Sequence, residues 1–188
     1  NNEIGLPLTI FKIREEHEVA VLEMGISHFD EMHRLAEMAQ PDIMVITNIG
    51  LCHLENLITR DGILKAKTES FEHLAEDGMV ILNGDDDKLA TVSEVNGRKP
   101  VFYGIGAVSD GSMEHGSTGN KREIFAENVR TVGLESTECT VHLGKEVFSV
   151  TLPLAGVHNV YNSLSAIAAC VKLGISMEDI REGLKNFT

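Results

Sequence analysis

Short apolar runs alternate with helical patterns along the first half of the chain, and this alternation allows only a few folds. The apolar runs predict strands at residues 18–24, 43–47, 79–83 and 100–104. The segments between them, at 30–39, 59–74 and 86–95, have the spacing typical of helices. Because successive strands joined through helices pair in parallel, the pattern predicts an α/β fold, a mostly parallel sheet flanked by helices.

The second half of the chain has a different pattern. Residues 124–132, 139–143 and 147–152 favour strands, and Gly144-Lys145 suits a hairpin turn between the last two, so we expect a small antiparallel patch near residues 122–152. Helical spacing returns at 157–173, and Ser176 is a capping-type start for a final helix to about residue 184. Residues 107–120 are rich in Gly and Ser and predict a mobile loop.

Charge and cysteine content narrow the classes of function. The 188 residues are 43% hydrophobic, enough for a sizeable core, and the formal net charge of −13 argues against general nucleic-acid or membrane binding. The three cysteines show no C-x-x-C spacing, which fits a reducing compartment, so we expect a cytoplasmic protein. No apolar run approaches the roughly 20 residues that cross a bilayer.

Lys67 occupies a position where the helical pattern calls for a core residue. It lies four residues from Ile63 and four from Phe71, on the apolar face of the predicted helix. A buried ammonium costs several kcal/mol unless it is paired, neutralised or chemically altered, which favours a functional role. The alternative is that its stem covers apolar surface while the charge reaches solvent.

Polar residues follow the predicted strands at the edge where parallel sheets bind ligands. Glu23 ends the first strand, Asn48 and His53 follow the second, and residues 85–87 are three aspartates after the third. A carboxylate and an imidazole from neighbouring strand ends suit a divalent cation or a catalytic pocket. Each also has a structural alternative, as a solvated charge, a hydrogen-bonded loop histidine or a helix cap.

Two asparagines lie three apart near the start of the helix predicted at 157–173. The carboxamides of Asn159 and Asn162 offer both a donor and an acceptor, which suits an adenine edge, although helix capping explains them equally well. The sequence contains no G-x-x-x-x-G-K-[ST] phosphate loop, no G-x-S-x-G, no H-E-x-x-H and no Rossmann glycine pattern. Hydrolase and dehydrogenase functions lose support accordingly.

Six motifs, in order, resemble the central ATP-binding domain of the Mur ligases over essentially the whole chain. They are Asn1-Asn2-Glu3-Ile4-Gly5-Leu6-Pro7-Leu8-Thr9, Glu23-Met24-Gly25, Thr47-Asn48-Ile49-Gly50 with His53-Leu54-Glu55, Ala66-Lys67, Leu82-Asn83-Gly84-Asp85-Asp86 and Gly156-Val157-His158-Asn159. Within the family, the opening motif is most similar to the members that add D-alanyl-D-alanine to UDP-N-acetylmuramoyl-tripeptide in peptidoglycan synthesis. The resemblance implies a P-loop NTPase-like fold with ATP and Mg²⁺ as cofactors.

The resemblance also implies roles for individual residues. Lys67 matches the family lysine that is carbamylated and helps to hold magnesium, and Glu23 and His53 match magnesium ligands. Asn159, Asn162 and Asn48 match nucleotide-binding positions. Asn1, Asn2, Ser27 and His28 match segments near the UDP-muramoyl substrate. Catalysis would then depend on Lys67 and His53.

Residues 1–188 would then form the central domain alone, without the P-loop and the N- and C-terminal domains of family members, and would be inactive as a ligase by themselves. Two alternatives stay open. One is another ligase of the superfamily, either a different Mur enzyme or a folylpolyglutamate synthetase-like protein. The other is a non-catalytic homologue that binds a nucleotide or a partner.

Overall fold

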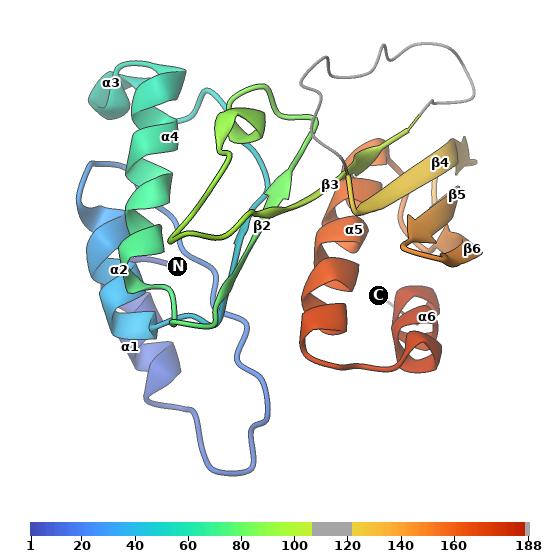
Figure 1. Cartoon of the computed structure of the whole chain (residues 1–188), viewed down its shortest axis with the longest axis horizontal. Helices are drawn as coiled ribbons and strands as arrows, with labels where there is room; N and C mark the ends of the chain where they lie inside the picture. The colour runs from blue at the N-terminus through green and yellow to red at the C-terminus, as the bar shows by residue number, and fades with distance from the viewer. Residues whose placement is uncertain (107–121, 187–188) are drawn as a thin grey trace. The chain divides into compact units, whose positions relative to one another are not determined.

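The computed structural model describes residues 1–106 and 122–186, which fall into two compact units. The first unit comprises Asn1–Met44 and Ile49–Met79, and the second comprises Val45–Asn48 and Val80–Thr188. The loop predicted at 107–120 lies outside the described residues. Figure 1 shows the elements of both units.

The first unit is mostly helical. Its helices are α1 (Gly5–Ile10), α2 (Glu31–Ala39), α3 (Leu54–Leu57), α4 (Arg60–Thr68) and the 3-10 helix η1 (Glu69–His73). α2 packs against α1, α4 and η1, and its Leu35 and Ala36 are fully buried. The helix predicted at 59–74 is therefore an α-helix that tightens into a 3-10 helix for its last turn.

Six strands form one sheet in the order β1-β2-β3-β4-β5-β6. They are β1 (Ile43–Ile46), β2 (Met79–Asn83), β3 (Val101–Ile105), β4 (Ile124–Val132), β5 (Ser136–Leu143) and β6 (Glu146–Leu152). β2, β3 and β4 pair in parallel, and β4, β5 and β6 pair antiparallel. The predicted α/β class and its antiparallel patch are both confirmed.

In the second unit, α5 (Val157–Lys172) packs on β3, β4 and β5, and α6 (Met177–Lys185) packs on β6. Leu164 and Ile167 of α5 are buried because they lie on its apolar stripe. Ser176 caps α6, with its hydroxyl oxygen accepting from the backbone N–H of Asp179 at 3.1 Å. Gly144 adopts φ 59° in the β5–β6 hairpin, as the turn requires.

Two predicted elements are wrong. Residues 18–24 form no strand; Val21 is 92% exposed, and a strand needs a hydrogen-bonding neighbour that no described residue gives this segment. Residues 86–95 contain only the 3-10 turn η2 (Leu89–Thr91) instead of a helix. Val92 is already extended, and Asn96 and Gly97 then turn the chain with positive φ.

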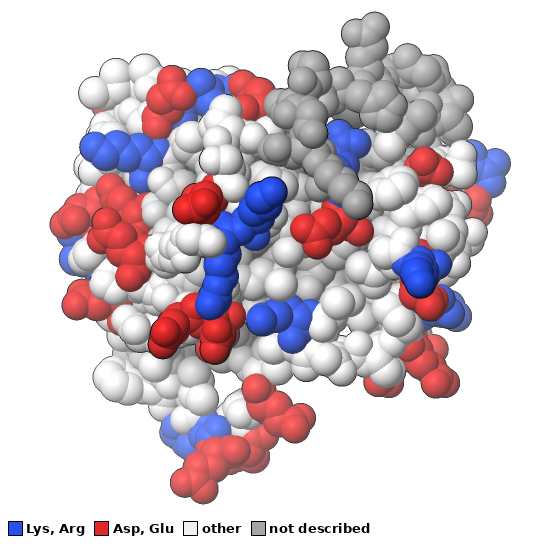
Figure 2. Space-filling view, viewed as in Figure 1, with Lys and Arg blue, Asp and Glu red and all other residues white. Residues whose placement is uncertain are grey.

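Charged side chains of both signs are mixed on the face shown in Figure 2, where the basic groups lie among acidic ones rather than in one broad basic area. Within the described ranges, no helix combines the length and apolar character needed to span a bilayer.

Candidate functional site

α4 presents the most informative residue, Lys67, and it begins with a side-chain cap. The hydroxyl oxygen of Thr59 accepts the backbone N–H of Gly62 at 3.1 Å, which satisfies one of the free donors at the start of the helix. Gly62 also allows a close approach, because a Cβ there would lie 2.0 Å from the carbonyl oxygen of Leu57. The cap and the contact fix where α4 starts relative to α3.

Lys67 lies in the last turn of α4 and is half-buried. The buried positions of this helix are Ile63 and Ala66, which are 3% and 0% exposed, so Lys67 flanks the apolar stripe rather than standing within it. Its carbonyl oxygen accepts the hydroxyl of Ser70 at 2.8 Å, at the change from α-helix to η1. Lys65 differs, since it is exposed with its Nζ 5.9 Å from the ring centroid of Phe29.

The two predicted magnesium ligands, Glu23 and His53, are both exposed. Glu23 lies in an extended segment without regular structure, instead of at a strand end. His53 adopts φ 62° at the start of α3, with its Nδ1 3.8 Å from the carboxylate of Glu55. Such a left-handed backbone is uncommon outside glycine.

Asn1 and Asn2 are tied into the fold of the first unit. The carbonyl oxygen of Asn1 accepts the N–H of Gly25 at 2.6 Å. The side-chain oxygen of Asn2 accepts the N–H groups of Ile4 and Gly5 at 3.1 and 2.8 Å, next to the start of α1. The contact with Gly25 joins the opening motif to the segment that contains Glu23.

Ser27 and His28 form a loop held by one carboxylate. Their backbone N–H groups donate to Glu31 Oε2 at 2.6 and 3.1 Å, and His28 Nδ1 lies 3.3 Å from Oε1. The hydrogen bond from Ser27 is the main cause that lowers the pKa of Glu31. Glu31 therefore stays ionised near neutral pH and keeps this loop in place.

The three asparagines predicted to bind nucleotide lie in the second unit. Asn48 is exposed after β1, with its amide nitrogen 3.4 Å from the Thr47 hydroxyl. Asn159 donates its side-chain N–H to the carbonyl of Ala155 at 2.9 Å, so it ties down the first turn of α5. Asn162 is exposed one turn later. α5 has no side-chain cap at Gly156, so neither asparagine caps this helix; Asn159 instead ties its first turn to Ala155.

Asp85, after β2, is structural, and the sequence did not indicate its partners. Asp85 Oδ2 accepts the backbone N–H of Ile105 at 2.7 Å and the hydroxyl of Tyr161 at 3.0 Å, while Oδ1 binds the guanidinium of Arg122. Asp86 accepts the N–H groups that begin η2. Arg122 and Tyr161 are 37 and 76 residues away from Asp85, a separation that no local pattern reveals.

The donor chemistry of the first unit fits magnesium only in part. Glu23 offers the oxygen ligand that Mg²⁺ prefers, whereas the imidazole of His53 suits softer metals. A lysine ammonium has no lone pair and cannot coordinate a cation, while a carbamate on the same nitrogen offers anionic oxygens. A carbamate on Lys67 would therefore add a donor of the kind that magnesium prefers. Among the described residues, Glu23 and His53 are not part of a group of three histidine, cysteine or acidic side chains close enough to hold one ion.

Comparisons with known proteins give one family. The model of the Mur ligase middle domain matches residues 1–170. The UDP-N-acetylmuramoyl-tripeptide–D-alanyl-D-alanine ligase of Bacillus subtilis is 38% identical over 184 residues, which are 98% of this chain and 36% of that relative.

Solved structures agree with this match. MurF from Acinetobacter baumannii has a TM-score of 0.83 and 32% identity, covering 99% of this chain and 38% of its own. The MurF ligase of Thermotoga maritima, solved in complex with ADP, has a TM-score of 0.81 at 24% identity and shows the same fold. Since the family model covers 170 of the 188 residues and the folds match over nearly the whole length, this chain belongs to the Mur ligase family and contains its middle domain.

Proposed function

We propose that this chain is the ATP-binding middle domain of a ligase that adds D-alanyl-D-alanine to UDP-N-acetylmuramoyl-tripeptide in the cytoplasm. The main support is the 38% identity to a ligase of that name across 98% of the chain. The chain spans 36% of that relative's length, so the complete reaction would also need the regions outside the match.

The reaction class joins a carboxylate to an amine at the expense of ATP. The tripeptide carboxylate attacks the γ-phosphorus, ADP leaves, and the amine of D-alanyl-D-alanine then displaces phosphate from the acyl carbon. Magnesium, when bound, neutralises the negative charges that approach one another in the first step. The chain's own residues bind and position the reactants, which is the main protein contribution to phosphoryl transfer.

Lys67 would act as a carbamate. Its neutral amine attacks the carbon of CO₂ and loses a proton, so that a cationic side chain becomes an anionic one. Lys67 lies half-buried in the last turn of α4. With Glu23, the carbamate would supply the oxygen ligands that magnesium prefers, and His53, the other family position, would add an imidazole nitrogen.

The other residues would bind the two substrates. The loop of Ser27 and His28 is fixed by Glu31, so it could meet the UDP-muramoyl substrate without the entropic cost of ordering a free loop. Asn159 is held by Ala155 at the start of α5, which directs its amide toward one side of the helix. An amide fixed in this way suits a nucleotide base better than a rotating one.

A chimeric enzyme tests the proposed activity. The segment of the Bacillus subtilis relative that aligns with this chain is replaced by the chain, and the product is identified by mass spectrometry with ATP, Mg²⁺, UDP-N-acetylmuramoyl-tripeptide and competing amines. We expect a product that contains D-alanyl-D-alanine. A folded chimera that ligates a single amino acid or glutamate instead would favour the other ligases of the superfamily, and one that binds ATP without any ligation would favour a binding module.

Carbon-13 NMR tests the carbamate separately. The chain is incubated with ¹³C-bicarbonate with and without Mg²⁺, and a carbamate resonance is expected in the wild type and in Lys65→Ala but absent from Lys67→Ala. Lys65 is a suitable control because it lies in the same helix and is exposed. Equal signals from both variants would refute the assignment to Lys67.

A further inference from the structure

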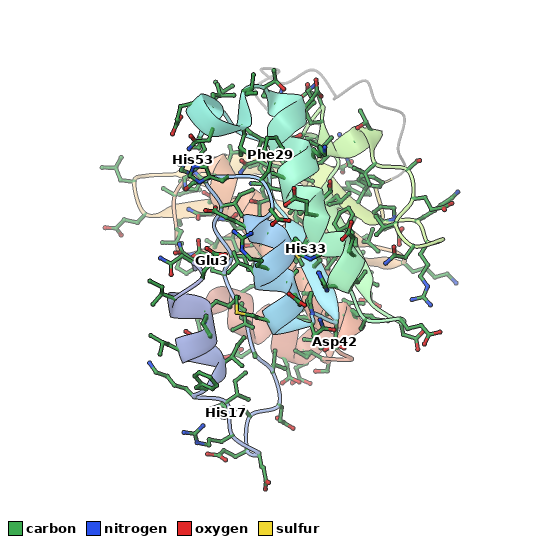
Figure 3. All side chains as sticks on the ribbon, turned by 90° about the vertical axis from the view of Figure 1, so that its left-hand side faces the viewer. Glu3, His17, Phe29, His33, Asp42 and His53 are labelled. Carbon is green, nitrogen blue, oxygen red and sulfur yellow. The ribbon has the colours of Figure 1, made fainter. Side chains whose placement is uncertain are left out.

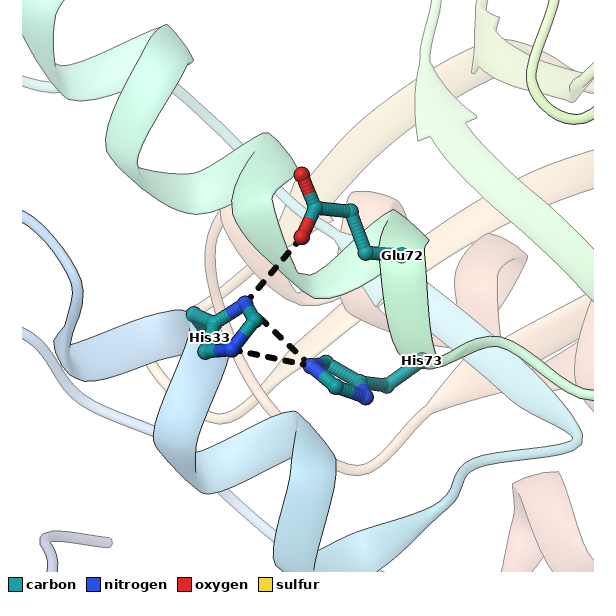
Figure 4. Close-up of side chains that lie close together, drawn as sticks. All are labelled: His33, Glu72 and His73. Atoms are coloured by element: carbon teal, nitrogen blue, oxygen red, sulfur yellow. Dashed lines mark hydrogen bonds and ion pairs between the residues drawn. The ribbon is translucent and has the colours of Figure 1, made fainter.

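Three side chains that the ligase reaction does not use meet on the surface of the first unit. His33 comes from α2, and Glu72 and His73 come from η1 (Figure 4). His33 Nδ1 lies 3.1 Å from Glu72 Oε2 and 3.2 Å from His73 Nε2. Within residues 1–106 and 122–186, this is the group of three histidine, cysteine or acidic residues whose ligand atoms all lie within 4.8 Å of one another.

The contacts among these three side chains determine where the protons of the two histidines lie. A neutral imidazole has one N–H and one lone pair, and a carboxylate has no proton to donate. With both histidines neutral, His33 Nδ1–H can donate to Glu72, and His73 Nε2–H can donate to the lone pair on His33 Nε2, which lies 3.4 Å away. A cation can take the place of these protons, because each of the three side chains has a lone pair to offer and their ligand atoms lie within 4.8 Å of one another.

The distances match the spacing of metal ligands. Zinc binds imidazole nitrogen and carboxylate oxygen at about 2.0–2.2 Å, so neighbouring ligand atoms of a tetrahedral site lie roughly 3.3 Å apart. With His33 Nδ1 as the ligand atom, Glu72 Oε2 lies 3.1 Å and His73 Nε2 lies 3.2 Å from it, and all three ligand atoms lie within 4.8 Å of one another. The two rings meet edge to face with centroids 4.4 Å apart, an arrangement that directs one ring's nitrogen at the other ring.

The site is accessible and its ligands select a class of metal. The side chains of His33 and Glu72 are 35% and 69% exposed, so an ion can enter without opening the core. Two imidazoles and one carboxylate favour Zn²⁺ and neighbouring transition metals, whereas Mg²⁺ and Ca²⁺ prefer oxygen ligands alone. Three protein ligands leave a position for water.

We propose that His33, Glu72 and His73 form a binding site for a divalent transition metal of the zinc class, distinct from the magnesium site of the ligase reaction. Such an ion ties η1 to α2. Because η1 begins at Glu69, directly after α4 ends at Thr68, the ion also restrains the helix on which Lys67 lies.

Metal titration of the chain tests this proposal. Co²⁺ serves as a spectroscopic probe in place of Zn²⁺, and calorimetry measures Zn²⁺ binding near neutral pH. We expect one Co²⁺ per chain, a visible absorption band typical of low coordination number, displacement by Zn²⁺, and no displacement by a large excess of Mg²⁺. Bound Zn²⁺ should raise the midpoint of thermal unfolding.

Substitutions show whether these residues are the ligands. We expect Zn²⁺ binding to weaken at least about tenfold in each of the variants His33→Asn, His73→Asn and Glu72→Gln. Even residues that only hydrogen-bond to a metal ligand contribute that much to affinity. His17→Asn is the control, because His17 is exposed and lies well away from His33 in Figure 3. Glu72 is so exposed that its substitution tests the site without challenging the fold.

Several outcomes would overturn the proposal. These are the absence of saturable Zn²⁺ or Co²⁺ binding, equal affinity in the folded His33→Asn/His73→Asn double variant, or loss of binding in His17→Asn alone. Circular dichroism of each variant confirms that loss of metal does not reflect unfolding.

Discussion

Removal of the Asp85 carboxylate should destabilise the second unit far more than removal of an exposed carboxylate. Asp85 is 15% exposed in its side chain, and its partner Arg122 is 16% exposed. The substitution Asp85→Ala leaves Arg122 without its counter-ion, and it removes the acceptor of the Ile105 N–H and of the Tyr161 hydroxyl. All three donors lose the same acceptor at once.

The expected cost follows from the burial of the pair. Removing one partner of a buried ion pair lowers the free energy of unfolding by about 3–5 kcal/mol, and each neutral donor left without an acceptor lowers it by about 1–3 kcal/mol. Water can enter the space that the carboxylate vacates, so we expect a total near 3–5 kcal/mol rather than the sum. With a urea dependence of about 2 kcal/mol per molar, the midpoint should fall by roughly 2 M.

Urea unfolding followed by tyrosine fluorescence measures this loss in the relevant unit. Both tyrosines of the chain, Tyr103 and Tyr161, belong to the second unit, and the chain has no tryptophan. Glu138→Ala is the matched control, because Glu138 forms an exposed ion pair with Arg130 in the same unit. Exposed pairs contribute little, so this midpoint should barely move.

Two further variants separate the contributions. Asp85→Asn keeps one oxygen acceptor and should lie between the wild type and Asp85→Ala. Adding Arg122→Met to Asp85→Ala removes the guanidinium charge that has lost its counter-ion, and it should restore part of the lost stability. The reasoning is refuted if Asp85→Ala shifts the midpoint no further than Glu138→Ala.

Three other predictions concern alkaline pH, thiols and a helix cap. Burial raises the pKa of Tyr103 and Tyr161 above the ordinary 10.0, so the stability contributed by the protonated phenols is present below pH 10 and is lost as the pH rises further. Ultraviolet absorbance should therefore show tyrosinate appearing only as the chain unfolds. Tyrosinate in the folded chain at pH 10 would contradict this prediction. Burial raises the pKa of the Cys139 thiol to about 11, whereas the Cys52 thiol is exposed. A disulfide reagent at pH 8 should therefore modify Cys52 first and Cys139 only in denaturant, and peptide mass mapping identifies the modified cysteine. Ser176→Ala should cost about 1 kcal/mol in urea unfolding, and an unchanged midpoint would show that the cap of α6 is unimportant.

The elements that the sequence predicted well are those specified locally. The β5–β6 hairpin has alternating burial on both sides of Gly144, and α6 begins at its capping serine. Such features depend on residues within a few positions of one another. They can therefore be identified without knowledge of the rest of the fold.

The wrong predictions involve partners that are distant in sequence. Residues 18–24 have strand-like composition, yet a strand exists only where another strand meets it. Asp86 was expected to begin a helix, and it does accept the N–H groups of Lys88 and Leu89, but the turn that it starts ends at Thr91. A capping residue specifies where a helix begins without specifying its length.

In the candidate site, too, features specified by nearby residues differ from those that depend on residues distant in sequence. Periodicity placed Lys67 within the apolar stripe, whereas the structure has it half-buried at the edge of the stripe that Ile63 and Ala66 form. The meeting of His33 with His73, 40 residues later, follows from the packing of α2 on η1 and has no signal in the sequence. The roles of Lys67, Glu23 and His53 in holding magnesium remain predictions from family resemblance.

The most direct test of the proposed ligase function is the rate of ADP release by the chimeric enzyme in the presence and absence of D-alanyl-D-alanine. We expect release that depends on D-alanyl-D-alanine in the wild-type chimera and in Lys65→Ala, and its loss in a folded Lys67→Ala variant. Turnover by Lys67→Ala at the wild-type rate, or ADP release by the wild-type chimera that is indifferent to D-alanyl-D-alanine, would contradict the proposal.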